Sequence, residues 1–180
     1  ELGPKASKAL DTLNSSLRDP NRGVREAALI AIGKVGSNAV SYLERILKRA
    51  RFWKVRWRAA QGLQNLGPAA APARNTLRRR LQDPTNEVKE KSAEALAAIG
   101  PKAFPILARS GLKHKWWRIR QIAALGLKQP TVKAPKKPMR GPAFVLRGLE
   151  NATRDTAQEV REAAAHSLSS YGPETIPYLR

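Results

Sequence analysis

Two short stretches of the sequence combine tryptophan or phenylalanine with several cations and no acid. The first, RARFWKVRWRAAQGL, covers residues 49–63, and the second, KHKWWRIRQIAALGL, covers residues 113–127. Aromatic rings stack on bases or sugars, anchor protein interfaces or enter the headgroup layer of a membrane, while arginine and lysine bind anions. Both stretches are therefore candidate binding surfaces, and packing within the fold is the competing interpretation.

Neighbouring residues at the start of a helix diverge by about 100°, so the aromatic and basic side chains of each stretch cannot all face a core. Trp53 and Trp117 stand two positions before a β-branched residue, where a tryptophan can pack over the end of the preceding helix. We expect at least one aromatic of each stretch to be exposed. The surface candidates are Arg51, Phe52, Lys54, Arg56, Trp57 and Arg58 in the first stretch and Lys115, Trp116, Arg118 and Arg120 in the second.

Two further segments are basic. The stretch RNTLRRRLQ, residues 74–82, contains three consecutive arginines at positions 78–80. They fan out around a helix, so some must face solvent. The segment at 129–141 adds about ten residues to the repeat described below, and its prolines exclude a helix. We interpret it as an extended arm that lies along a phosphate backbone, with a solvated loop as the alternative. The candidates here are Arg78, Arg79, Lys133, Lys136, Lys137 and Arg140.

The positive charge of the chain is concentrated in two windows. The 180 residues carry 34 Lys and Arg against 14 Asp and Glu, a formal charge of +20. Residues 45–82 hold 11 basic side chains and residues 95–149 hold 12, and neither window contains an acid. The rest of the chain is slightly acidic. This distribution favours a polyanionic partner or an anionic surface.

Composition excludes several other classes of protein. The chain has no cysteine and only two histidines, which lie far apart in sequence, so we expect no disulfide, metal site or cofactor. No apolar run approaches the roughly 20 residues that cross a bilayer. A hydrophobic content of 42% with only 6% aromatics predicts a core of alanine and leucine, which favours closely packed helices. The sequence gives no indication of the cellular compartment.

A Val or Ile followed by a cation recurs along the chain at positions 24, 55, 88, 119 and 160. The spacings of 31, 33, 31 and 41 indicate a repeat of about 32 residues, which is typical of a solenoid. A glycine followed by proline, as at Gly67 and Gly100, ends one helix and starts the next. Each repeat is therefore predicted to consist of two helices.

The stretches RDPNRGVREAAL, QDPTNEVKEKSAEAL and RDTAQEVREAAAHSL, with their LGP and AIG closures, resemble HEAT repeats of the short type that also occurs in phycobilisome-lyase relatives. The resemblance implies an all-α, right-handed α-solenoid of about five two-helix repeats in one domain. The repeats, numbered one to five, cover about residues 2–36, 37–67, 68–100, 101–130 and 141–172, and a partial repeat covers 173–180. Because both ends resemble interrupted repeats, we expect the chain to be a fragment of a longer array.

The repeats alternate at the turn between their two helices. Asp19, Asp83 and Asp155 stand six residues before the cation of repeats one, three and five, whereas Ala50 and His114 occupy this position in repeats two and four. Aspartate at a tight turn satisfies free backbone donors of the next helix. Without their own aspartate, Arg56 and Arg120 bind either an aspartate of a neighbouring repeat or an external anion.

These features predict a non-enzymatic basic module that binds DNA or RNA mainly through the phosphate backbone. The alternative is a protein-interaction scaffold for an acidic or nucleic-acid-containing partner in a larger assembly, which is the common use of HEAT arrays. A membrane surface is less favoured, because no helix has a broad apolar face. Some DNA glycosylases also resemble HEAT repeats, but a carboxylate here would have to come from Asp83 or Glu87, which have ordinary turn or surface explanations. We name no catalytic residue and expect no small-molecule substrate.

Overall fold

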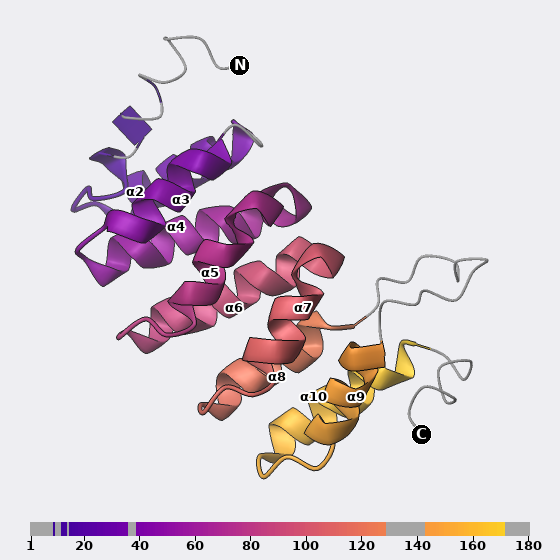
Figure 1. Cartoon of the computed structure of the whole chain (residues 1–180). Helices are drawn as coiled ribbons and strands as arrows, with labels where there is room; N and C mark the ends of the chain where they lie inside the picture. Colours follow the sequence, from indigo (N-terminus) through magenta and orange to yellow (C-terminus); the bar gives the residue numbers. More distant parts are fainter. Residues whose placement is uncertain (1–8, 10–11, 14, 36–38, 129–142, 172–180) are drawn as a thin grey trace. The chain divides into compact units, whose positions relative to one another are not determined.

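Helices make up the ordered elements of the chain, and no strand occurs among the residues described (Figure 1). The computed structural model describes residues 9, 12–13, 15–35, 39–128 and 143–171. The chain divides into two compact units, Glu1–Ile99 and Gly100–Arg180. The predicted all-α class is confirmed, and each unit stacks helix pairs as an α-solenoid does.

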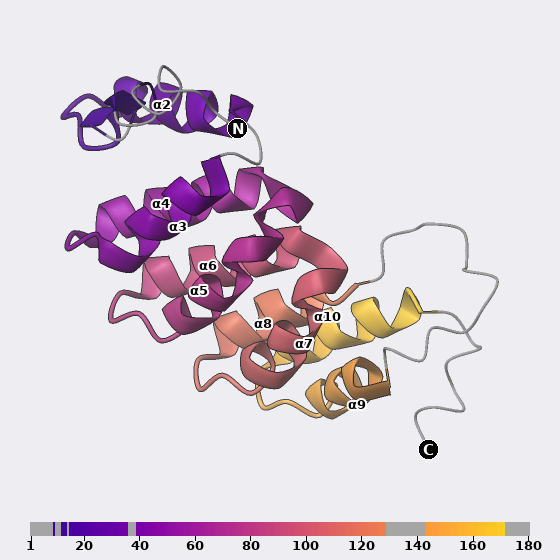
Figure 2. The same ribbon diagram turned by 45° about the horizontal axis from the view of Figure 1, so that its top comes forward.

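Unit 1 contains the described parts of repeats one to three. Its helices are α2 (Arg22–Lys34), α3 (Val40–Arg49), α4 (Trp53–Asn65), α5 (Arg74–Arg80) and α6 (Asn86–Ile99), with the 3-10 turn η2 (Gly67–Ala73) leading into α5. In Figures 1 and 2, α3 lies beside α4 and α5 lies beside α6, and the second pair stacks on the first. The first helix of each pair is thus next to the first helix of the following pair.

Unit 2 contains the described parts of repeats four and five. The first helix of repeat four is irregular and consists of η3 (Gly100–Ala103), α7 (Phe104–Ile106) and the π-helical turn η4 (Leu107–Gly111). Its second helix is α8 (Trp117–Gly126), and repeat five is formed by α9 (Ala143–Ala152) and α10 (Gln158–Ser169). Helix α10 packs against both α8 and α9 (Figure 2).

Small residues allow the helices of each pair to approach closely. A β-carbon placed on Gly111 would lie 2.5 Å from the β-carbon of Ala123, closer than such atoms approach one another. Buried alanines such as Ala59, Ala60 and Ala93 serve the same purpose, and leucines fill the space between them. The predicted alanine and leucine core is therefore present in both units.

The glycine and proline junctions behave as the sequence predicts. Gly67 and Gly100 have φ angles of +53° and +73°, a region that other residues rarely adopt, and Pro68 and Pro101 follow them. Each junction ends a second helix and starts the next repeat. Among the described helices, none combines the length and apolar character that a membrane crossing requires.

Candidate functional site

The aspartates of repeats one, three and five close their own turns, as predicted. The Oδ1 atom of Asp19 accepts a hydrogen bond from the backbone N–H of Asn21 at 2.7 Å. Asp83 does the same for Thr85 at 3.1 Å, and Asp155 for Ala157 at 2.9 Å. Each carboxylate therefore holds the chain just before the second helix of its repeat.

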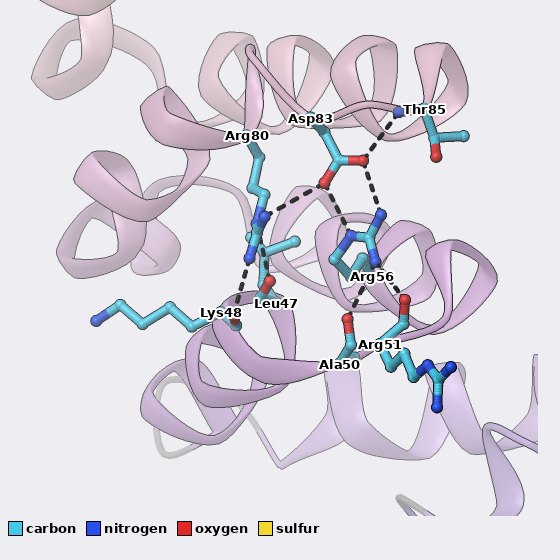
Figure 3. Close-up of polar contacts among 8 residues, drawn as sticks. All are labelled: Leu47, Lys48, Ala50, Arg51, Arg56, Arg80, Asp83 and Thr85. Atoms are coloured by element: carbon cyan, nitrogen blue, oxygen red, sulfur yellow. Dashed lines mark hydrogen bonds and ion pairs between the residues drawn. The ribbon is translucent and has the colours of Figure 1, made fainter.

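Asp83 also binds the arginine of the preceding repeat (Figure 3). Arg56 Nε donates to Asp83 Oδ2 at 2.8 Å and Nη2 donates to Oδ1 at 2.9 Å, a two-point ion pair. The Arg56 side chain is 9% exposed and that of Asp83 is 0% exposed. Arg56 Nη1 donates to the carbonyls of Ala50 and Arg51 at 3.0 and 2.8 Å. The pair links repeats two and three within unit 1.

Unit 2 repeats this arrangement. Arg120 Nε and Nη2 donate to Asp155 Oδ2 and Oδ1, both at 2.7 Å, and Nη1 donates to the carbonyls of His114 and Lys115. Of the two interpretations that the sequence left open, binding to a neighbouring aspartate is the one observed. The guanidinium groups of Arg56 and Arg120 are used inside the fold, so we leave both residues out of the proposed binding surface.

The ion pairs hold both carboxylates in the charged form. Burial alone would raise the pKa of Asp83, but the hydrogen bonds from Arg56 and Thr85 and the charges of Arg56 and Arg80 outweigh it and lower the pKa. For Asp155 the hydrogen bond from Arg120 is the largest influence, and it lowers the pKa against the effect of burial. Neutralising either carboxylate therefore weakens the link between repeats.

Arg80 forms a second link between repeats two and three. Its Nε donates to the carbonyl of Leu47 at 2.9 Å, and its Nη2 donates to that of Lys48 at 2.8 Å, so it closes the C-terminal end of α3 (Figure 3). Arg80 Nη1 also lies 3.4 Å from Asp83 Oδ2. The neighbouring Arg78 and Arg79 are exposed. The expectation that part of this arginine run faces solvent is confirmed.

Arg25 of repeat one lacks the carboxylate partner that Arg56 has, because position 50 is an alanine. Its Nη1 donates to the carbonyls of Asp19 and Pro20, as Arg56 does to its own turn. Its Nε is buried and finds no hydrogen-bond partner among the described residues. By the equivalence of the repeats, this Nε corresponds to the atom that binds Asp83 in the case of Arg56. The turn of repeat two offers Ala50 instead of an acceptor.

The turn of repeat two, residues 50–52, exposes its aromatic and basic side chains. Phe52 is 67% exposed and Trp53, the first residue of α4, is 37% exposed. Arg51 and Lys54 are also exposed. The first turn of α4 contains no acid, and no side chain caps it. A helix start of this kind is positively polarised, which adds to the charge of the two cations.

Trp57 and Arg58 are less accessible than the sequence suggested. Both are half-buried, and Lys91 Nζ lies 5.3 Å from the ring centroid of Trp57. Arg58 Nη1 donates to the carbonyl of Leu17 at 2.9 Å. Burial, with a further effect of the charge on Arg25, lowers the pKa of Arg58. These two side chains thus contribute to the packing of α4.

The turn of repeat four, residues 112–116, covers its aromatics more fully. Buried His114 takes the place of the aspartate, and its Nδ1 lies 3.1 Å from the backbone N–H of Trp116, which donates to it. Trp116 and Trp117 are half-buried, so the expectation that at least one aromatic of this stretch is exposed is wrong for repeat four. His114 holds the backbone of Trp116 at this turn, and the guanidinium carbon of Arg118 lies 5.9 Å from the ring centroid of Trp117, arrangements that the one-dimensional pattern does not encode. Lys115 and Arg118 are exposed.

Several exposed cations escaped the sequence analysis, and four predicted ones cannot be placed. Arg45, Lys48 and Arg49 are exposed on α3, where a spacing of three or four residues along a first helix was the available signal. Lys48 pairs with Glu44 at 2.9 Å. The predicted basic arm, with Lys133, Lys136, Lys137 and Arg140, lies outside the described residues. No group of acids and histidines suited to a metal ion occurs among the residues described.

The family model for HEAT repeats matches residues 1–63 and 40–128. The chain therefore belongs to the HEAT-repeat family. The fold of this family generally serves as an interaction scaffold without enzymatic activity. The sequence matches none of the curated proteins with which it was compared.

Solved structures with similar folds are helical-repeat proteins. A designed armadillo repeat protein in complex with the peptide (KR)4 is 16% identical with a TM-score of 0.55, and the alignment covers 93% of this chain and 83% of that one. The TOG domain of Crescerin, which regulates microtubules in the primary cilium, is 20% identical with a TM-score of 0.51, covering 94% and 80%. The complex of CpcE and CpcF of phycocyanin lyase from Nostoc is 27% identical with a TM-score of 0.48, covering 88% and 62%.

Proposed function

We propose that this chain is a non-enzymatic module that binds nucleic acid mainly through the phosphate backbone. The surface consists of exposed cations at the turns of repeats two and four and at the C-terminal end of α5, each taken within its own unit. Its members are Arg51, Lys54, Arg78 and Arg79 in unit 1 and Lys115 and Arg118 in unit 2. The cations of the arm, Lys133, Lys136, Lys137 and Arg140, extend the same charge along the sequence.

One observation carries the proposal: the buried guanidinium of Arg56 is paired with a carboxylate, whereas no ion pair among the described residues involves Arg51 or Lys54 at the turn of repeat two. Arg56 is matched by Asp83 inside the fold. Arg51 and Lys54, a few residues away, belong to a window without acids and remain exposed. Within the part of the chain that the structure describes, these two cations have no acidic partner, so a polyanion can bind them.

The salt dependence of binding tests the proposal. We would titrate labelled duplex DNA, single-stranded RNA and heparin with the full chain over a series of salt concentrations. Neutralising about six phosphates gives a slope of log affinity against log salt of about −5. A steep slope, with nucleic acid preferred over heparin, supports the proposal. A shallow slope, or equal competition by heparin, argues against it.

The comparison of exposed residues offers a control within the chain. Arg18 of repeat one is exposed and lies outside both acid-free windows. The Arg51→Gln variant is expected to weaken binding at low salt, and the Arg18→Gln variant, which removes the same charge, is expected to have a smaller effect. Equal losses would mean that net charge alone governs the affinity.

A protein partner is the second candidate function, because exposed Phe52 and Trp53 resemble the aromatic anchors of protein interfaces. The designed armadillo protein of similar fold binds a basic peptide. Since this chain is itself basic, its partner would be acidic. Such an interface depends on a few central side chains rather than on many cations, so its affinity would fall sharply in Phe52→Ala and only mildly with salt.

A further inference from the structure

We infer that the turn of repeat two binds single-stranded nucleic acid, with an unpaired base stacked on Phe52 and phosphates held by the cations around it. The inference rests on the proposed function and specifies its substrate class. It concerns unit 1 alone. Three features carry it: the exposure of the Phe52 ring, the neighbouring Trp53 with its lysine, and the position of the cations at the C-terminal ends of α3 and α5.

The backbone of Phe52 has a structural role that its side chain does not share. The residue is extended, with φ −81° and ψ 128°, and directly precedes α4. Its carbonyl accepts hydrogen bonds from the N–H groups of Val55 and Arg56 at 3.1 and 3.2 Å. A polar residue could make the same backbone contacts. The residue is nevertheless 67% exposed, which leaves an apolar side chain in water.

Trp53 adds a second aromatic surface next to the first. It is 37% exposed, and Lys54 Nζ lies 5.8 Å from the centroid of its ring. A cation beside an exposed aromatic pair matches the chemistry of a nucleotide, which has a planar base and a charged phosphate. In unit 2 the corresponding Trp116 and Trp117 are half-buried. The exposed aromatic pair of unit 1 is thus the better surface for stacking of a base.

The contacts of Arg80 place further cations near this turn. Because Arg80 donates to the carbonyls of Leu47 and Lys48, the C-terminal ends of α3 and α5 lie together (Figure 3). Arg49 follows Lys48 in the chain, and Arg78 and Arg79 precede Arg80, and all three are exposed. They therefore belong to the same end of unit 1 as Arg51 and Phe52.

Among the described residues, the acids of this region do not pair with Arg49, Arg51 or Lys54. Glu44 is half-buried and is bound by Lys48 and Thr76. Burial raises its pKa, but the hydrogen bonds from Thr76 and Lys48 and the charges of Lys48 and Arg79 outweigh this effect and lower the pKa. The Asp83 side chain is buried against Arg56. The first exposed acid after Glu44 along the chain is Glu87, in the first turn of α6. Phosphates are thus the matching ligands for Arg49, Arg51 and Lys54.

The exposed ring selects a single strand over a duplex. In a duplex the bases are stacked on one another and offer only their edges and the backbone, so a ring on a protein surface gains little. Unpaired bases have free faces, and stacking on an aromatic side chain is tolerant of sequence. Binding through phosphates alone would serve both forms equally. A preference for the single strand would therefore report the contribution of Phe52.

The test compares a labelled oligothymidylate of about fifteen nucleotides with a duplex of the same length, within the range of known single-strand site sizes. We expect Phe52→Ala to weaken binding of the single strand about tenfold, the usual effect of losing one stacking contact, and to change duplex affinity by less than about twofold. Phe52→Tyr keeps the ring and should retain affinity. Circular dichroism checks that each variant is folded.

Phe144 provides the matched control, because it is an exposed aromatic of unit 2 with Arg109 at 5.5 Å from its ring. Phe144→Ala is expected to leave both affinities unchanged. If Phe52→Ala weakens both polymers equally, or neither, while Arg51→Gln weakens both, the stacking inference is wrong and the proposed function stands. If neither variant changes binding and the salt slope is shallow, both are wrong.

Discussion

The turns of repeats two and four start from similar sequences and differ in what they leave exposed. In repeat two, small Ala50 stands at the turn, and Phe52 and Trp53 are open to solvent. In repeat four, His114 is buried at the turn and accepts the N–H of Trp116, and the two tryptophans are half-buried. Both turns are followed by an arginine that bridges to the next aspartate.

The comparison indicates that the features shared by the two turns and the features that differ have separate roles. The arginine and aspartate pairs join repeats two and three in unit 1, and repeats four and five in unit 2. The residues between the two helices differ in the two turns, and both links are present. We assign stability to the ion pairs and ligand binding to the exposed residues of the turn, and the following predictions test that division.

The largest effect is expected from breaking the buried ion pair of unit 1. Asp83→Ala leaves the Arg56 charge without its partner, so the free energy of unfolding should fall by about 3–5 kcal/mol. Asp155→Ala should cost less, because the Arg120 and Asp155 side chains are 15% and 12% exposed and water can replace the lost contact. Hydrogen exchange of the two units measures both. A larger cost for Asp155→Ala would contradict the ranking.

The next effect concerns the close packing that holds each helix pair. Gly111→Ala in unit 2 places a methyl group 2.5 Å from the β-carbon of Ala123, so we expect a loss of about 1–3 kcal/mol from overpacking. Gly62→Ala in unit 1 meets the methyl groups of Leu43 at 3.0 Å, and these belong to a side chain that can move. Urea unfolding should therefore show the smaller loss for Gly62→Ala.

A third variant converts the turn of repeat two into the aspartate type. Ala50→Asp supplies an acceptor for the backbone at the start of α4 and for the buried Nε of Arg25. We expect a stabilisation of about 1 kcal/mol, the size of a typical hydrogen-bond contribution. The same change adds a negative charge beside Arg51 and should weaken binding of nucleic acid. Unchanged affinity would separate the turn from the binding surface.

The smallest effect is the response of the Asp155 pair to acid. Because its pKa is lowered in the folded state, Asp155 contributes stability above its unfolded pKa of about 3.9. That contribution is lost as the pH falls through the folded pKa. The stability of unit 2 should thus decrease between neutral pH and pH of about 3 by more in the unchanged protein than in Asp155→Asn. An equal pH dependence of stability in both proteins would show that Asp155 does not contribute to it.

The ion pairs between repeats could be predicted in part from the sequence, because the turn aspartates and the cations follow a fixed spacing. An aspartate six residues before the cation that follows a β-branched residue predicts the turn, and its absence at Ala50 and His114 led to the neighbouring aspartate as one of two partners. The proline that follows Gly67 and Gly100 allowed the two helix junctions to be predicted.

The exposure of individual aromatics could not be predicted in the same way. Whether Trp57 or Trp116 is covered depends on residues from other elements, such as Lys91 against Trp57, which lie far away in sequence. The replacement of an aspartate by His114 as acceptor also depends on the direction of its ring. Side-chain surroundings, rather than the repeat pattern, decide which cations and rings remain available to a ligand.

The central claim is that exposed cations at the turn of repeat two contact phosphates, and the salt slope of one variant tests it most directly. We would measure the affinity for single-stranded DNA of the unchanged chain and of the double variant Arg51→Gln, Lys54→Gln over the same salt series. We predict that the slope of log affinity against log salt becomes shallower by about one to two in the double variant, since each lost phosphate contact reduces the slope by about one or slightly less. An identical slope in both proteins would contradict it.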